Sequence, residues 1–215
     1  MNFLRRCRRM DKMISFEKKW FRTLFVLILG VLLGVMVIHS NKMINDDSIV
    51  YKVLSTLDVK GFSGRISFWL IIVTIVSIYS NSPFRAFINV LALTAGVLGG
   101  YYGYTTLIFS EEFVFNLNTW IIYASVACSI SMIIWYAKGE GWFSVLISSL
   151  LIAFLFRESF SYGMWFFNIK HIQEIVFLSL SIIVLFNNLP KTIITIFYSL
   201  PIAIVYELLI PYIGL

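Results

Sequence analysis

Apolar stretches separated by short polar segments recur along the whole chain. Seven of them are candidate membrane spans, at about 21–39, 64–80, 86–108, 118–137, 142–157, 172–187 and 191–210. Lipid offers no hydrogen-bond partners to open backbone N–H and C=O groups, so segments of this kind are stable in a bilayer only as helices. The pattern therefore predicts an all-α fold, a polytopic transmembrane helical bundle of about seven spans.

Three of these segments, the second, fifth and sixth, have short apolar cores of about 12–16 residues. At 1.5 Å per residue, such a core is shorter than a hydrocarbon layer roughly 30 Å thick. Each short segment must draw its polar flanks toward the interface, thin the bilayer, or fail to cross it. Six spans are therefore the alternative to seven.

Composition strengthens the membrane interpretation, because 60% of the 215 residues are hydrophobic and only 13% are charged. Lys and Arg exceed Asp and Glu by six, and eight basic residues precede or open the first apolar segment: Arg5, Arg6, Arg8, Arg9, Lys12, Lys18, Lys19 and Arg22. This position favours a cytoplasmic segment at 1–20 that faces anionic lipid, and argues against nucleic acid as a partner. Counted over alternate segments, the N-terminal side carries eleven Lys and Arg, the eight above with Arg85, Lys138 and Lys191, against six on the opposite side. This bias predicts a multi-pass plasma membrane protein with a cytoplasmic N-terminus.

A basic start followed by an apolar segment is also typical of a signal peptide. The apolar run at 24–38 is long for a signal core, and no clear small-residue cleavage site follows it. We interpret it as an anchor and first span. Residues 21–215 then form a single transmembrane domain with an outer loop at 40–64, whose apolar positions Ile49, Val50, Val53, Leu54 and Leu57 predict a short surface helix, a lid or connector or else a binding element.

Glycines spaced four residues apart predict where helices pack. The pairs are Gly30 with Gly34, Gly96 with Gly100, and Gly99 with Gly103. Each pair lies on one helix face, where the lack of side chains lets two backbones approach closely. The partner helix lies within this chain or on another membrane protein, and we expect internal packing.

Three motifs between residues 66 and 185 resemble an uncharacterised family of small multi-spanning membrane proteins from Gram-positive bacteria. They are NSPFRAFINV at 81–90, WYAKGEGW at 135–142 and FSYGMWFFN at 160–168. The resemblance implies a location in the membrane and no activity, because the family is a domain of unknown function. In physical terms the first motif is a turn and a helix start, with Asn81 or Ser82 as the cap and Pro83 in the first turn, from which Arg85 can reach cytoplasmic phosphates.

One group of polar residues is a candidate ligand-binding site on the predicted outer side. It comprises Arg157, Glu158, Tyr162, Trp165, Asn168, His171 and Glu174, with Lys170 between them and Glu207 near the outer end of the last span. Ionisable groups at membrane depth are costly unless they are paired or hydrated, so these residues indicate either a cavity or a set of surface ion pairs.

Enzyme motifs are missing from the sequence. It contains only two histidines and no HExxH, GxSxG or Gly-rich lysine loop, so we expect no catalytic residues, no metal site and no cofactor. Cys7 and Cys128 are expected at different membrane depths and therefore without a disulfide.

Two classes of function remain. The first is small-solute binding or transport, for example as a substrate-binding subunit of an importer. The second is a non-transporting partner, assembly, immunity or regulatory subunit of another membrane complex, whose glycine faces and basic segment bind the partner protein. A ligand-sized cavity in the polar group would favour the first class, and closely packed side chains there would favour the second.

Overall fold

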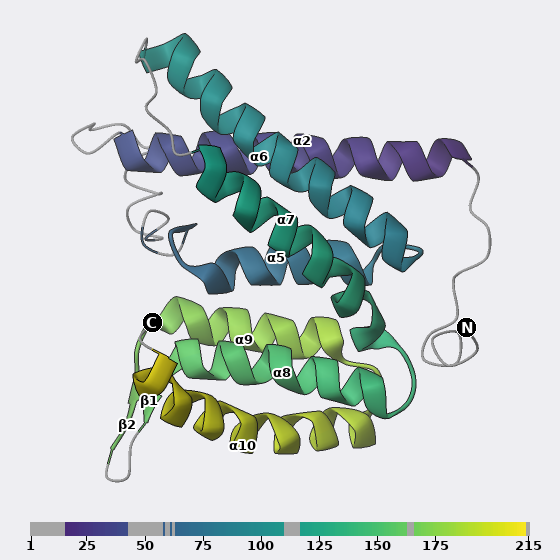
Figure 1. The fold of residues 1–215 in the computed structure, drawn as a ribbon, viewed down its shortest axis with the longest axis vertical. Coiled ribbons are helices and arrows are strands. Elements are labelled where there is room, and N and C mark those ends of the chain that lie inside the picture. The colour runs from purple at the N-terminus through teal and green to yellow at the C-terminus, as the bar shows by residue number, and fades with distance from the viewer. Residues whose placement is uncertain are drawn as a thin grey trace. The chain divides into compact units, whose positions relative to one another are not determined.

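The computed structural model describes residues 16–42, 58, 61, 63–109, 117–162 and 166–213, and it is almost entirely helical there (Figure 1). The predicted segments correspond to the helices α2 (Phe16–Lys42), α5 (Ile66–Ile78), α6 (Pro83–Phe109), α7 (Leu117–Ile134), α8 (Trp142–Ser159), α9 (Ile172–Leu185) and α10 (Leu189–Ile213). The prediction of a helical bundle is confirmed. The contacts group into an N-terminal unit within Asp11–Met132 and a C-terminal unit within Ile133–Leu215.

Five of these helices are long and apolar enough to cross a membrane. The candidate spans are Lys19–Ser40, Pro83–Ile108, Trp120–Lys138, Trp142–Ser159 and Leu189–Glu207. The fourth contains one of the segments with a short apolar core. Its helix also takes in Arg157, whose charge is paired, and reaches 18 residues. The 13 residues of α5 and the 14 of α9 remain short, at about 20 Å each.

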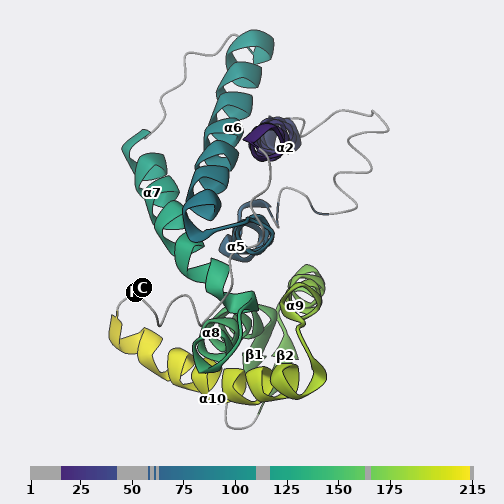
Figure 2. The ribbon, with the colours of Figure 1, turned by 90° about the vertical axis from the view of Figure 1, so that its right-hand side faces the viewer.

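The N-terminal unit is built on the crossing of α2 and α6 (Figures 1 and 2). The two helices run parallel, since Thr23 hydrogen-bonds Asn89 near their starts and His39 hydrogen-bonds Tyr104 near their ends. A Cβ atom added to Gly30 would lie 3.1 Å from the Cα of Gly96. The backbones therefore meet directly, as expected for small residues on two facing helices.

Helix α5 leads into α6 through a turn at 79–82. Its end is closed by backbone bonds from Tyr79 and Ser80, and Ser82 caps α6 by accepting a 3.2 Å hydrogen bond from the backbone N–H of Arg85. Pro83 occupies the first position of the helix, where its missing N–H costs nothing. Of the two predicted caps, Ser82 is the one that makes the bond.

The C-terminal unit packs α9 and α10 against α8 (Figure 1). Helices α8 and α10 are parallel and are joined by polar contacts along their length. Near their starts, Lys191 Nζ donates to Gly139 O and to Ser144 Oγ at 2.6 Å each. In the middle, Ser149 Oγ donates to Thr195 O at 3.0 Å. These bonds satisfy buried hydroxyls and tie the two helices in one register.

The 3₁₀ helix η1 (Trp135–Lys138) and a turn lead into α8. Gly141, at the N-cap position, has a φ of 87°, a conformation that favours glycine. This explains the glycine at position 141 of the motif at 135–142. Helices α8 and α9 are joined by an antiparallel hairpin of β1 (Phe160–Tyr162) and β2 (Phe167–Ile169), which the sequence analysis treated only as an outer loop.

Two predictions lie outside the described residues. One is the conformation of the basic segment before Phe16, and the other is the surface helix expected from Ile49 to Leu57 in the outer loop.

Candidate functional site

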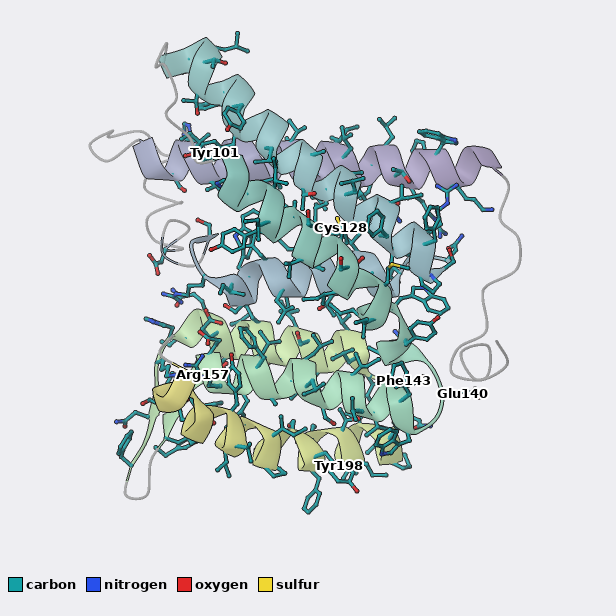
Figure 3. The ribbon with its side chains drawn as sticks, in the orientation of Figure 1. Tyr101, Cys128, Glu140, Phe143, Arg157 and Tyr198 are labelled. Atoms are coloured by element: carbon teal, nitrogen blue, oxygen red, sulfur yellow. The ribbon has the colours of Figure 1, made fainter. Side chains whose placement is uncertain are left out.

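Arg157 is the centre of the predicted polar group. It lies in the last turn of α8 (Figure 3), where its Nε donates to Glu207 Oε2 at 3.0 Å and its Nη1 to Glu158 Oε1 at 2.9 Å. The guanidinium carbon also lies 5.1 Å from the ring centroid of Tyr206. Two carboxylates and an aromatic face thus surround one cation, which joins the end of α8 to α10.

The hairpin is held to the same end of α8. Lys170 donates to the backbone of α8 twice, from its N–H to Ser159 O and from its Nζ to Arg157 O, each at 2.9 Å. The rings of Phe156, Phe160 and Phe167 pack together beside these bonds. The two short strands therefore pack against α8 through this cluster of aromatic rings.

Tyr162 joins the hairpin to α10. Its hydroxyl donates to Ala203 O at 2.7 Å. Burial raises the pKa of the Tyr162 phenol above its ordinary value, the negative charge of Glu207 raises it further, and the Arg157 guanidinium partly opposes this. The phenol therefore stays a hydrogen-bond donor at neutral pH.

The bonds of this network do not include Asn168, His171 or Glu174. Asn168 and His171 are exposed, Glu174 is 1% exposed in the first turn of α9, and Trp165 lies outside the described residues. The structure therefore brings Arg157, Glu158, Tyr162 and Glu207 together: Arg157 pairs with both glutamates, and Tyr162 bonds to the backbone of α10. Within the described part of the chain, no group of three His, Cys, Asp or Glu side chains is arranged to hold a metal ion.

The glycine pairs have two different environments. A Cβ on Gly30, Gly34, Gly96 or Gly100 would collide with backbone of the facing helix, whereas one on Gly99 or Gly103 would meet no atom of the described residues within 4 Å. The first four glycines are therefore packed within this chain. The other two lie on an open face of α6, which also carries the exposed Leu91, Ala95, Thr106 and Leu107.

A second polar site, which the sequence analysis did not assemble, lies in the N-terminal unit. A shallow pocket with a volume of about 10 Å³, partly open to the surroundings, is lined by Lys19, Arg22, Ser80, Asn81, Arg85 and Asn89. In the sequence, Arg85 and Asn81 are recognisable only as parts of a turn. The start of α2, which completes the site, lies about 60 residues away in the sequence, so no local pattern predicts the contact.

These features define a class of protein. A chain with five membrane-length helices, polar contacts confined mostly to helix ends and broad exposed apolar faces is a multi-pass membrane protein. Comparisons with models of protein families, with curated proteins and with solved structures find no match. The likeness to a Gram-positive membrane family stays a prediction from the motifs.

Proposed function

We propose that the protein is a non-transporting subunit of a membrane complex, located in the plasma membrane, and that it acts by packing against another membrane protein. The observation that carries the proposal is the pairing of Arg157 with both Glu158 and Glu207. A cation that is paired with two carboxylates of the same chain supports a structural role for the outer polar group more than a solute site.

The open face of α6 supports the same proposal. Its glycines at 99 and 103 repeat the spacing by which Gly96 and Gly100 receive α2, but no other helix of the described chain comes within 4 Å of their Cβ positions. A transmembrane helix of a partner protein is the occupant that fits such a surface, because small residues allow close backbone contact in lipid.

Photo-crosslinking in native membranes tests this proposal. A photoreactive amino acid at position 99 or 103 is expected to give one heterotypic adduct of defined mass. The matched control is position 122, where Ile122 is 61% exposed on α7, a helix that contains no glycine. Equal, diffuse labelling at positions 99, 103 and 122 would contradict the proposal, and so would an adduct of two copies of this chain.

Solute binding is the second candidate, and one observation favours it. The side chains of Glu158 and Glu207 remain 29% and 39% exposed, and two carboxylates against one guanidinium leave a net negative charge. A cationic solute is the class that this arrangement would attract. The test is a thermal-shift screen of the detergent-purified protein, since a ligand of the folded state raises the melting temperature.

Variants make the screen decisive. A cationic ligand whose stabilisation is lost in Glu207→Gln, while Lys138→Gln responds like the wild type, would favour solute binding. No stabilisation by any solute in a well-folded sample, together with a heterotypic adduct at position 99 or 103, would favour the partner subunit.

A further inference from the structure

We infer that the basic pocket of the N-terminal unit binds a phosphate group, and that the headgroup of an anionic phospholipid is its source. The pocket brings together three cationic side chains from two helices: Lys19 and Arg22 from the first turns of α2, and Arg85 from the first turn of α6. This site is independent of the proposed contact with a partner protein.

The floor of the pocket is an ordered chain of hydrogen bonds. Thr23 Oγ1 donates to Asn89 Oδ1 at 2.8 Å, Asn89 Nδ2 to Ser80 Oγ at 2.9 Å, and Ser80 Oγ to Val76 O at 2.7 Å. Asn89 is 8% exposed and Ser80 is 3% exposed. Because its polar groups are already fixed, the floor needs no rearrangement to present its rim to a ligand.

The cations on the rim keep most of their donors available. Arg22 Nη1 donates to Asn81 Oδ1 at 2.7 Å, which orients one guanidinium and leaves its other N–H groups directed elsewhere. Among the described residues, no carboxylate forms an ion pair with Lys19, Arg22 or Arg85. The three positive charges repel one another, and a bound anion would reduce that repulsion.

Helix direction adds to the positive potential. Since α2 and α6 are parallel, the starts of both helices lie at this end of the unit, and the backbone N–H groups of a helix start carry partial positive charge. Phosphate suits the side-chain donors of Lys19, Arg22 and Arg85, because its oxygens accept several charge-assisted hydrogen bonds at once.

Exposed apolar side chains on the same turns favour a lipid over a free ion. Trp20 and Phe21 on α2 are 58% and 72% exposed, and Phe84 on α6 is 65% exposed. A headgroup at the pocket would place its acyl chains among such side chains, while the shallow pocket has too little depth to enclose a whole soluble metabolite.

Native mass spectrometry of the full-length protein from mixed micelles tests the inference. With equal amounts of phosphatidylglycerol and phosphatidylcholine, we expect the wild type to retain one phosphatidylglycerol preferentially. Arg85→Gln and Arg22→Gln should weaken this retention roughly tenfold, and Arg85→Lys should keep most of it. The matched control is Lys138→Gln, which removes a positive charge from the other unit.

Inorganic phosphate distinguishes the two sources. If millimolar phosphate displaces the lipid from the wild type and raises the melting temperature of lipid-free protein, the site binds phosphate but its source is soluble. If phosphate has no effect and phosphatidylglycerol is retained, the lipid is the source. Equal lipid retention by the wild type, Arg85→Gln and Lys138→Gln, with no effect of phosphate, would overturn the inference. Because no side-chain bond holds Arg85 in the described structure, a folding defect is not expected in Arg85→Gln.

Discussion

At the scale of single residues, Arg157 and Glu207 are unequal partners in their ion pair. Glu207→Gln removes one charge and leaves Arg157 paired with Glu158, so we expect a loss of less than about 1 kcal/mol at these partly exposed groups. Arg157→Gln leaves two carboxylates facing each other and should cost about 1–3 kcal/mol. Denaturant unfolding in detergent measures both changes.

The double variant Arg157→Gln/Glu207→Gln provides the control for this prediction. It removes both the cation and one of the repelling carboxylates, so its stability should exceed that of Arg157→Gln alone. Additive losses in the double variant would mean that the two side chains do not interact in solution.

Tyr162 makes the stability of the folded protein depend on pH in the alkaline range. A phenol whose pKa is raised in the folded state adds its full stabilising free energy at pH values below the unfolded pKa of about 10. This stabilisation is lost as the pH rises through the folded pKa. The wild type should therefore lose stability above pH 10 more steeply than Tyr162→Phe. At neutral pH, Tyr162→Phe should be about 1 kcal/mol less stable, because the bond to Ala203 O is missing.

Melting temperatures of the two proteins from pH 7 to 11 check this prediction. The other tyrosines titrate in both proteins, so the difference between the two curves isolates Tyr162. A constant difference across this range would show that the phenol is not buried in the folded protein.

At the scale of helices, the glycines of α6 separate two kinds of packing. Gly96→Ala places a Cβ against Leu27 O of α2 and should destabilise the protein by about 1–3 kcal/mol. Gly99→Ala meets no atom within 4 Å and should be neutral or stabilising by up to about 1 kcal/mol, because alanine favours a helix. Thermal unfolding in detergent gives the comparison, and equal losses in the two variants would contradict the assigned face.

Helix positions and local caps were predictable from the sequence because they depend on neighbouring residues. Ser82 and Pro83 start α6, and Gly141 permits the turn before α8, by rules that act within four residues. The hairpin was missed although Phe160, Tyr162, Phe167 and Ile169 alternate with polar or small positions, since three-residue strands give little signal between charged residues.

Contacts between distant segments could not be predicted in the same way. Spacing alone does not distinguish Gly96 and Gly100, which receive α2, from Gly99 and Gly103, which do not. The basic pocket depends on Arg22 meeting Asn81, a contact set by the parallel crossing of α2 and α6. Similarly, the sequence placed His171 beside Arg157 in one candidate site, but the hairpin directs the backbone so that His171 is exposed.

At the scale of the whole molecule, parallel helix pairs bear on the number of spans. In the N-terminal unit, α2 and α6 start at the same end, so the chain between them must return, and α5 is the helix that leads to the shared end. In the C-terminal unit, α8 and α10 are parallel, and α9 is the returning element. Both short helices therefore accompany a reversal of direction, which favours seven crossings over six.

Cysteine accessibility in intact cells tests seven crossings together with the cytoplasmic N-terminus. In a Cys7→Ser/Cys128→Ala background, a membrane-impermeant maleimide should label Asn168→Cys in the hairpin from outside. It should label Glu140→Cys and Asn187→Cys only after permeabilisation, because these exposed positions lie in the turns before α8 and after α9. Labelling of Asn187→Cys but not Glu140→Cys from outside would mean that α9 does not cross the membrane. The fully inverted pattern would keep the crossings and reverse the orientation that the basic N-terminal segment predicts, because the rule acts on charge and not on helix packing.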